Sequence, residues 1–437
     1  MLNMETVKQA TIEVPVQALR VEIVAGVDQG LVYAGASDAC SVGTADGNDV
    51  VLHDPSTSRF HLEVARKSDG ILVVDHGSTN GTWFGSARIE RAVVAPGTML
   101  RAGATQLRVG DGPASSITIH RGESLAGIVG RSAVMRRLFS QIERAAQSVA
   151  STLVTGESGT GKELVARALH DLGPRRSQPF VVVDCGALAP TLVASELFGH
   201  ERGAFTGADR QHIGAIERAS GGTVFFDEIG ELPPSLQVSL LGVLQRRRFR
   251  RLGGRDEIAA DIRVVSATHR DLRSEVNAST FRLDLFYRLA VVVLRIPPLR
   301  ERAEDVPLLV AAFARATGHE GDVGELFSPE TMAQLSTQRW SGNVRELQNL
   351  IESTIAMGDL ADRAAPSAPR GTQGPASSGD ELVPYRSARD RVLADFERDY
   401  VTRLYARANG NASLAAREAR MDRSHLLDLL RKHGLKS

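Results

Sequence analysis

Cysteine is scarce in this chain, which has only Cys40 and Cys185 among its 437 residues. The two are far apart, and neither stands in a Cys-x-x-Cys or histidine-rich setting. The sequence therefore supports neither a disulfide framework nor a zinc site. We expect both side chains to be core thiols.

Long apolar runs are also missing. No stretch approaches the roughly 18 apolar residues that a membrane-spanning helix needs. The segment from Met1 to Arg20 lacks the basic and then apolar pattern of a signal peptide. We therefore expect a cytoplasmic protein with no membrane contact. The length allows about three domains, each large enough to bury its own core.

Net charge is absent as well, since 52 basic side chains balance 52 acidic ones. This balance argues weakly against nucleic-acid binding, but the charge is unevenly distributed. Residues 386–437 hold twelve Lys and Arg against seven Asp and Glu, a net charge of +5. A nucleic-acid contact is therefore expected at the C-terminal end.

Composition divides the chain into blocks. Residues 361–385 are rich in Pro, Gly, Ser and Ala without an apolar period, which is typical of a flexible linker. A shorter break is expected at residues 110–124, around Asp111-Gly112-Pro113. The predicted domains cover residues 1–115, 124–360 and 386–437.

Each block has its own periodicity. Short β-branched runs separated by Gly, Asp and Ser, for example at 21–25, 50–53 and 71–74, predict an all-β sandwich at the N-terminus. The central block alternates strands with helices, which is the pattern of a parallel α/β sheet. The C-terminal block has helical apolar spacing, so we expect it to be all-α.

A glycine-rich loop follows the strand predicted at 151–155 and opens a helix. Its glycines let successive backbone N–H groups face a phosphate chain, the helix N-terminus adds partial positive charge, and Lys162 neutralises the outer phosphates. Glu163 stands where most such loops have the Ser or Thr that binds Mg²⁺. We expect ATP to be bound by Gly156, Glu157, Ser158, Gly159, Thr160, Gly161, Lys162 and Glu163.

Two carboxylates, Asp227 and Glu228, end the apolar strand predicted at 223–227. We expect Asp227 to hold Mg²⁺ through water and Glu228 to orient and polarise the attacking water. ATP and Mg²⁺ are therefore the predicted cofactors. The alternative, two acids that are merely hydrogen-bonded, is weak beside the glycine-rich loop.

A loop with the sequence Gly-Ala-Phe-Thr-Gly-Ala lies between these two motifs. Its glycines make it flexible, and it presents one aromatic ring and one hydroxyl. Together with residues 196–201, it resembles the signature of bacterial enhancer-binding proteins, the AAA+ activators of sigma-54 RNA polymerase. The resemblance spans about residues 124–360 and implies that the loop grips the sigma factor and moves with the ATP cycle. The implied contacts are Gly203, Ala204, Phe205, Thr206, Gly207 and Ala208.

The same resemblance implies further nucleotide-binding groups. Thr268 takes the position of the family's γ-phosphate sensor, followed by His269 where the family often has Asn. Arg282 and Arg288 are candidates for an arginine finger that reaches the ATP of a neighbouring subunit, and Arg288 is the better candidate. A finger of this kind implies a ring, expected to be a hexamer. Arg345 is the implied second sensor, in a helical lid at about 300–360.

One position near the site departs from the family pattern. Asp184 stands where the family commonly has an Asn that hydrogen-bonds the catalytic Glu and holds it inactive. A carboxylate cannot donate a hydrogen bond to ionised Glu228, so we expect weaker restraint of basal hydrolysis. A run with five arginines at 245–251 is interpreted as a solvated helix end, and a DNA-contacting pore loop is the alternative.

Turn residues of the N-terminal domain resemble those of the forkhead-associated (FHA) domain, a phosphothreonine-binding sandwich. The resemblance implies that Ser58 and Arg59 meet the phosphate, that Thr79 assists, and that Asn80 holds the peptide backbone. Thr44 replaces the family's usual Arg, which predicts weaker phosphate binding. The alternatives are an unphosphorylated partner and the ATPase domain of the same chain. The resemblance also implies that His61 and Gly43 shape the site. The matching positions are Gly43, 49–52, Ser58, Arg59, His61 and 78–82.

The C-terminal block predicts two helices, at 413–419 and 423–433, joined by a short turn. This helix-turn-helix is similar to the Fis-like domains that end many enhancer-binding proteins. We expect Arg423, Ser424 and His425 to contact base edges, and Arg431 and Lys432 to contact phosphates. A small helical dimerisation module is the alternative, and the positive charge favours DNA.

The sequence thus predicts a multidomain protein with an all-β sandwich, an α/β P-loop AAA+ ATPase with a helical lid, and an all-α helix-turn-helix. The predicted function is ATP-dependent activation of transcription. The protein would bind upstream enhancer DNA and remodel the sigma-54 RNA polymerase holoenzyme, under control of a phosphothreonine protein or a Ser/Thr kinase. The alternatives are an AAA+ ATPase that remodels another protein and a DNA-binding repressor. The loop at 203–208 argues against the first, and the complete ATPase motifs argue against the second.

Overall fold

A computed structural model describes residues 11–35, 39–67, 69–186, 190–319, 321, 323–357, 404, 412, 415–416, 421 and 423–432. Contacts divide the chain into two compact units, Met1–Asp362 and Arg363–Ser437. The predicted linker at 361–385 lies outside the described residues. Among the described residues, no helix is long and apolar enough to cross a membrane.

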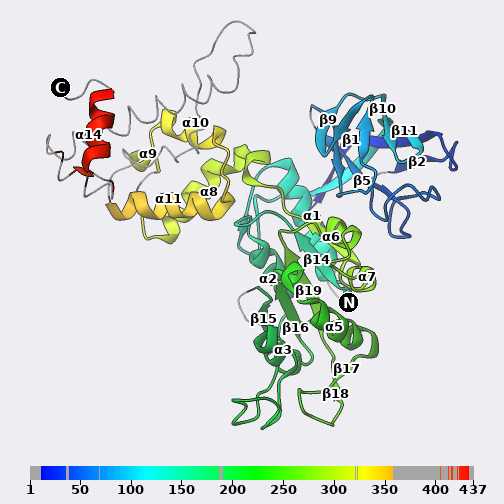
Figure 1. Ribbon diagram of the computed structural model, residues 1–437, viewed down its shortest axis with the longest axis vertical. Coiled ribbons are helices and arrows are strands. Elements are labelled where there is room, and N and C mark those ends of the chain that lie inside the picture. The colour runs from blue at the N-terminus through cyan, green and yellow to red at the C-terminus, as the bar shows by residue number, and fades with distance from the viewer. Residues whose placement is uncertain are drawn as a thin grey trace, which may run out of the picture. The chain divides into compact units, whose positions relative to one another are not determined.

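The N-terminal part is a sandwich of two sheets (Figure 1). Leu19, Leu62 and Leu107 are among the fully buried residues that fill the space between the sheets. The predicted all-β sandwich is therefore confirmed. One sheet has the order β2-β1-β11-β10-β7-β8, with β1 Thr11–Ala25, β2 Val32–Gly35, β7 Thr82–Phe84, β8 Ala87–Ile89, β10 Thr98–Ala102 and β11 Thr105–His120. The other has the order β4-β3-β5-β6-β9, with β3 Ala39–Gly43, β4 Val50–Val51, β5 Leu62–Lys67, β6 Gly70–Asp75 and β9 Arg91–Val94.

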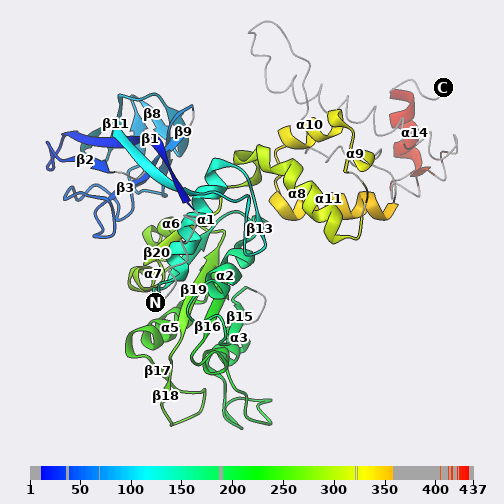
Figure 2. The same cartoon turned by 180° about the vertical axis from the view of Figure 1, so that it is seen from behind.

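Strands β1 and β11 continue beyond the sandwich as a two-stranded ribbon that reaches α1 (Ala133–Ala146) (Figure 2). There the Ser140 hydroxyl donates to the carbonyl oxygen of Thr118 at 2.7 Å, and Arg136 Nε donates to that of His120 at 2.6 Å. The break expected at 110–124 is therefore mostly strand. Gly112 and Pro113 lie at an irregularity in the β1–β11 register, where a residue without an N–H donor is tolerated.

The central part contains a five-stranded parallel sheet of order β15-β16-β19-β14-β20. Helices α1 and α2 pack on one face, and α3, α5 and α7 pack on the other. Because parallel strands end at the same edge, the loops after β14, β16 and β19 converge. The strands are β14 Thr152–Thr155, β15 Phe180–Asp184, β16 Thr223–Asp227, β19 Arg263–Thr268 and β20 Val292–Arg295. The helices are α2 Lys162–Asp171, α3 Pro190–Phe198, α4 Ala215–Arg218, α5 Pro234–Arg246, α6 Leu272–Asn277 and α7 Leu283–Leu289.

A helical lid follows the sheet. It consists of α8 Val306–Ala316, α9 Val323–Leu326, α10 Pro329–Thr337 and α11 Asn343–Met357, with two short 3₁₀ helices before them at Leu299–Glu301 and Ala303–Asp305. Its core includes Phe327 and Trp340. The buried Asp305 accepts hydrogen bonds from the backbone N–H groups of Arg131 and Ser132, which ties the lid to the start of α1. The predicted α/β fold with a lid is confirmed.

The C-terminal unit is described in part. Helix α14 (Arg423–Lys432) corresponds to the second helix of the prediction, whereas most of the first helix lies outside the described residues. Ala412, Ala415 and Ala416 pack with Leu426 and Leu430 of α14 in a small core.

Candidate functional site

The predicted ATP-binding loop, residues 156–161, connects β14 to α2. Gly159 and Gly161 have φ values of +76° and +99°, a region that favours glycine. Lys162 begins α2 and is only 8% exposed. Its ammonium donates to the carbonyl oxygens of Gly156 at 3.2 Å and Glu157 at 3.4 Å. The positive charge is thus held at the loop where the predicted phosphates would lie.

Glu157 links this loop to the lid. Its carboxylate accepts two hydrogen bonds from Arg300, at 2.8 and 2.5 Å, and one from Asn343 Nδ2 at 3.1 Å. The Arg300 hydrogen bonds lower the pKa of Glu157 and outweigh its burial. The sequence motif did not reveal Arg300 as a partner, because it lies 143 positions from Glu157.

Arg345, the predicted second sensor, also contacts the loop. Its backbone N–H donates to the carbonyl oxygen of Gly159 at 3.2 Å, and its guanidinium donates to the Ser158 hydroxyl at 3.4 Å. A Cβ at Gly159 would collide with the carbonyl oxygen of Gly342. The glycine therefore permits the close approach of lid and loop, and Arg345 lies against the predicted ATP-binding loop.

The two predicted catalytic carboxylates lie at the end of β16. Asp227 accepts a hydrogen bond from the backbone N–H of Glu228 at 3.0 Å. Burial and the neighbouring charge of Glu228 raise the pKa of Asp227. Glu228 has a φ of +49°, which turns its side chain away from the strand direction and toward Lys162, whose Nζ lies 3.3 Å from Glu228 Oε1. The pair therefore faces the ATP-binding loop.

His269, directly after β19, holds the second oxygen of Glu228. Glu228 Oε2 lies 2.7 Å from His269 Nδ1 and accepts the His269 backbone N–H at 3.1 Å. Burial would raise the pKa of Glu228, but these hydrogen bonds and the charge of Lys162 outweigh it and lower the pKa. The neighbouring sensor candidate, Thr268, is fully buried, and its hydroxyl accepts the N–H of Arg270.

Asp184, at the end of β15, accepts the backbone N–H of Gly186 at 2.8 Å. It pairs in register with Asp227 on the neighbouring strand. A carboxylate at this place adds negative charge beside the catalytic pair and raises the pKa of Asp227 further. The carboxylate that replaces the family's Asn therefore lies beside the two predicted catalytic carboxylates.

The two arginine-finger candidates lie at the two ends of α7. Arg282 precedes the helix and is ion-paired with Asp284 at 2.7 Å. Arg288 lies in the last turn and is exposed, with no ion pair in the part of the chain that the structure describes. A guanidinium that is exposed and has no ion-pair partner among the described residues is suited to act on another subunit. Arg288 as the finger stays a prediction.

The loop of residues 203–208, called here the GAFTGA loop, is a tight turn between α3 and α4. The N–H of Gly203 donates to the carbonyl oxygen of Ala208 at 2.8 Å, and both Gly203 and Gly207 have positive φ. The Phe205 ring is 39% exposed and packs edge-on against His200 at 4.9 Å. Thr206 is exposed. The loop thus presents the ring and hydroxyl that the sequence predicted.

Arg251 connects the base of this loop to α4. It donates to Glu201 at 2.7 Å and to both oxygens of Glu217, at 2.9 and 2.6 Å. Two of its neighbours in the predicted arginine run, Arg248 and Arg250, pair with Glu257 across the β17–β18 hairpin (Arg248–Phe249 and Ile258–Ala259). The sequence predicted that the run is a solvated helix end, but α5 ends at Arg246 and the run continues into β17, so only its first part is a helix end.

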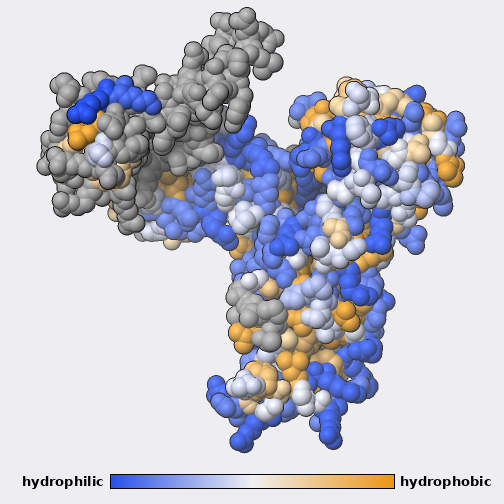
Figure 3. Space-filling model, viewed as in Figure 1, coloured by the Kyte–Doolittle hydropathy of each residue, from blue (hydrophilic) through white to orange (hydrophobic). Residues whose placement is uncertain are grey.

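The GAFTGA loop and the β17–β18 hairpin lie side by side at one end of the ATPase part (Figure 1). A Cβ at Gly253 would come within 2.9 Å of the Ala204 side chain, so the two segments touch there. In Figure 3 the tips of this end are hydrophilic, and hydrophobic surface lies next to them. Both segments therefore form one continuous surface.

The predicted phosphopeptide residues gather at one end of the sandwich. The Thr79 N–H donates to the Ser58 hydroxyl at 3.0 Å, and the Asn80 side chain donates to the carbonyl oxygen of Ser56 at 2.7 Å. Ser58 is half-buried, whereas Arg59, Thr79 and Asn80 are exposed. The loop before β5 and the loop before β7 are thus joined into one edge that carries all four predicted residues.

Two predicted shaping residues hold this edge. His61 is fully buried, its Nδ1 accepts the N–H of Ser58 at 3.1 Å, and its Nε2 lies 3.2 Å from the carbonyl oxygen of Gly81. Burial lowers the pKa of His61, which favours the neutral ring that these two contacts need. A Cβ at Gly43 would collide with the carbonyl oxygen of Arg59. Both residues therefore act on the shape of the edge.

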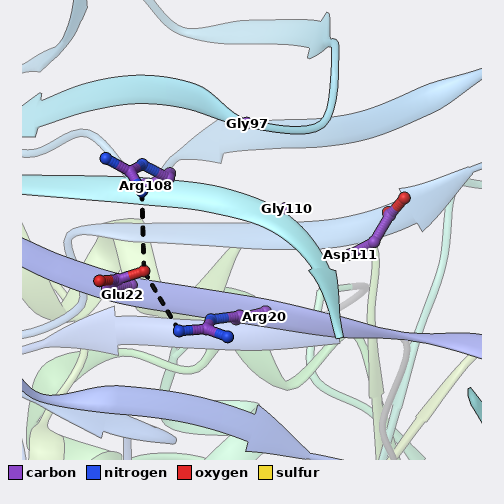
Figure 4. A pocket seen from close by; sticks show the side chains of 6 residues that line it. All are labelled: Arg20, Glu22, Gly97, Arg108, Gly110 and Asp111. Carbon is purple, nitrogen blue, oxygen red and sulfur yellow. Dashed lines mark hydrogen bonds and ion pairs between the residues drawn. The ribbon is translucent and has the colours of Figure 1, made fainter. Parts of the chain in front are cut away.

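A cavity of about 330 Å³ lies elsewhere in the sandwich, over strands β1 and β11 (Figure 4). Arg20 and Arg108 flank Glu22, at 3.3 and 4.0 Å, so their charges are partly neutralised. None of the four predicted phosphopeptide residues lines this cavity. The candidate ligand edge is therefore an exposed surface and not this pocket.

Both cysteines are buried thiols, as expected. Burial raises the pKa of Cys185 to about 12, and also raises that of Cys40. In the described part of the chain, no group of His, Cys, Asp and Glu side chains is arranged to hold a metal ion. Of the predicted DNA contacts, Arg423, Ser424, His425, Arg431 and Lys432 all lie on α14, and Ser424, Arg431 and Lys432 are exposed.

Protein-family models match the part of the chain that forms the predicted nucleotide site and the lid. Residues 128–295 match the model of the sigma-54 interaction domain, and residues 300–364 match that of an AAA+ ATPase lid domain. Residues 22–112 match the model described as an inner membrane component of T3SS, cytoplasmic domain. The first two matches cover the residues that form the ATP-binding loop, the catalytic pair, the GAFTGA loop and the lid.

Individual proteins are similar over the same region. The chain is 42% identical over 305 residues to the transcriptional regulatory protein ZraR of Escherichia coli, covering 69% of this chain and 67% of ZraR. It is 42% identical over 342 residues to the DNA-binding transcriptional regulator NtrC of Azospirillum brasilense, covering 71% of each. The crystal structure of NtrX from Brucella abortus with ATP has a TM-score of 0.52 at 34% identity, covering 72% of this chain and 70% of NtrX. The chain therefore belongs to the family of AAA+ transcriptional regulators that carry a sigma-54 interaction domain.

Proposed function

We propose that this ATPase opens sigma-54 promoters by moving its GAFTGA loop against the sigma factor in each ATP cycle. The observation that carries the proposal is the coexistence of an exposed Phe205–Thr206 turn with a complete set of nucleotide groups in the same part of the chain. The Arg251 pairs give the base of the turn a rigid connection to α4. A change at the nucleotide can therefore move the turn as a unit.

The chain's own residues fit ATP and Mg²⁺. The backbone N–H groups of the positive-φ glycines and the Lys162 ammonium would hold the phosphates. Asp227 would bind Mg²⁺ through water, and the ion would neutralise charge on the transferred phosphoryl group. Glu228 would orient and polarise the attacking water once ATP draws Lys162 away from it. Glu163 has no hydroxyl for the metal, so Asp227 carries the metal contact.

Ring formation completes the site. Arg288 is exposed at the end of α7 and would reach the γ-phosphate held by the next subunit. Thr268 and Arg345 would sense the nucleotide from within the same subunit. A hexameric ring would bring six GAFTGA loops together and let them act on one sigma factor.

The N-terminal sandwich would regulate the ATPase, and the C-terminal unit would bind the DNA site. The N-terminal sandwich is proposed to be an FHA-type domain that binds phosphothreonine through Ser58, Arg59, Thr79 and Asn80, because these residues share one edge. Helix α14 is proposed to be the recognition helix of a Fis-like helix-turn-helix that binds upstream DNA. It carries Arg423, His425, Arg431 and Lys432 in ten residues.

The test is ATP-dependent open-complex formation with sigma-54 RNA polymerase on a promoter with an upstream site for this protein. We expect the wild type to open the promoter, Lys162→Ala to lose both ATP hydrolysis and opening, and Thr206→Ala to lose opening while it still hydrolyses ATP. Ser239→Ala removes an exposed hydroxyl on α5 and serves as the matched control. Opening by Thr206→Ala at the wild-type rate would overturn the proposed role of the loop.

A further inference from the structure

One aromatic side chain of the sandwich is buried in the ATPase core. Phe60 follows Arg59 in the loop before β5 and is 1% exposed. It packs with the hydrophobic cluster of the ATPase sheet rather than with the core of the sandwich. Its ring makes an edge contact with Phe286 of α7 at 5.1 Å, and the Arg273 guanidinium of α6 lies 5.7 Å from the ring centroid.

Asn277, the last residue of α6, holds the backbone of this loop and that of His76, directly after β6. Asn277 Nδ2 donates to the carbonyl oxygens of Phe60 at 2.6 Å and His76 at 2.8 Å, and its Oδ1 accepts the Phe60 N–H at 3.3 Å. Arg59 Nη1 donates to the carbonyl oxygen of Val276 at 3.3 Å. Helix α6 thus engages the backbone of the loop and the guanidinium that was predicted to meet phosphate.

Polar pairs surround this aromatic centre. His76 lies 2.6 Å from Asp271, and Glu63 pairs with both Arg273 and Arg295. An aromatic anchor with a rim of polar pairs is the usual arrangement of a specific protein interface. The surface formed by α6 and α7 is therefore built to receive this edge of the sandwich.

We propose, on the basis of the proposed phosphothreonine function, that the α6–α7 surface is an internal ligand of the sandwich that competes with phosphothreonine peptides. The competition follows from shared atoms, because Arg59 and the loop around Phe60 serve both partners. The docked sandwich also reaches the finger helix: the Gly47 N–H donates to the Tyr287 oxygen at 3.4 Å, and Tyr287 directly precedes Arg288. The docked state therefore contacts the finger helix next to Arg288, and a bound phosphopeptide would remove this contact.

The test uses Asn277→Ala in the full chain, because Asn277 belongs to the ATPase part and leaves the peptide-binding residues unchanged. The probe is a degenerate phosphothreonine peptide pool, with the unphosphorylated pool as the negative control. We expect the variant to bind the phosphorylated pool about tenfold more tightly than the wild type. In the wild type, docking leaves only a fraction of the molecules with a free peptide-binding edge, and the variant increases this fraction. Its ATP turnover without sigma-54 polymerase is expected to rise as well. Asn349→Ala, an exposed Asn on α11, is the matched control.

Hydrogen exchange at the backbone of 59–61 and 286–287 gives a second readout that needs no peptide. Faster exchange at both segments in Asn277→Ala supports the docking. The proposal is overturned if both proteins bind the phosphorylated pool with equal affinity, or if exchange is unchanged at both segments. If neither protein binds the phosphorylated pool, the phosphothreonine function fails, and faster exchange with higher turnover still supports the docking itself. Phe60→Ala provides a second variant for the exchange readout at 286–287, since its ring lies outside the core of the sandwich and packs on Phe286, and faster exchange there is expected.

Discussion

Replacement of His269 by Ala is expected to release Glu228 and raise ATP turnover in the absence of sigma-54 polymerase. His269 Nδ1 lies 2.7 Å from Glu228 Oε2, while the backbone N–H of residue 269 would remain as a donor in the variant. Asp184 cannot provide the amide donor that the family commonly has there. We therefore expect the His269 side chain to restrain the catalytic carboxylate in this chain.

The size of the effect follows from this one hydrogen bond. A hydrogen bond to a charged group contributes about 1.5–3 kcal/mol. His269 is 46% exposed, so water replaces part of the lost contact, and the low end of that range applies. This corresponds to an increase in turnover of up to about tenfold.

The assay is steady-state phosphate release by the full-length protein at saturating ATP, with ATP affinity measured in parallel. His269→Asn replaces the ring nitrogen by an amide donor, and its turnover is expected to lie between those of the wild type and His269→Ala. Unchanged or lower turnover in His269→Ala, at unchanged ATP affinity, would show that the contact positions Glu228 for catalysis instead of restraining it.

Three further predictions concern other parts of the chain. Asp184→Asn adds a donor beside Glu228 and should lower ATP turnover without sigma-54 polymerase; no change would remove the proposed role of this position. Arg251→Ala breaks the pairs at the base of the GAFTGA loop and should reduce promoter opening about tenfold or more while ATP turnover falls much less, and equal losses would contradict the mechanical role. Burial opposes ionisation of Asp54, yet the hydrogen bonds that it accepts lower its pKa to about 2, so its stabilising contribution is complete above pH ~4 and is lost as the pH falls through 2. Thermal unfolding between pH 4 and pH 2 should therefore depend less on pH in Asp54→Asn, and identical slopes would refute this.

The sequence predicted those parts of the site that are local in the chain. The ATP-binding loop is contiguous from β14 into α2, so its glycines and Lys162 specify their own geometry. The GAFTGA turn is local in the same way. By contrast, the contact of His269 with Glu228 spans 41 positions and depends on the adjacency of β16 and β19 in the sheet. Strand order was not available from periodicity, so the function of His269 in holding Glu228 was not predicted.

The break expected near residue 110 is a second feature that local sequence did not predict correctly. Gly112 and Pro113 favour a turn by local propensity, but pairing with β1 keeps them inside a strand because the register irregularity absorbs both residues. Phe60 is the third case. Its sequence context is a surface loop, and its burial depends on Asn277 and α7, the former 217 positions away. Tertiary contacts of this range leave no signal in local sequence.

The paired strands β1 and β11 affect how tightly a phosphopeptide must bind in order to displace the docked sandwich. They join the sandwich to α1, so the sandwich stays near α6 even when its contacts there are broken. For short tethers the effective local concentration is of the order of millimolar. A phosphoprotein at micromolar concentration would then compete with an α6–α7 surface whose effective concentration is about a thousandfold higher. Only a ligand that binds tightly, or that is held close by, could displace this surface. The ribbon would thus set a threshold that filters out weak phosphopeptides.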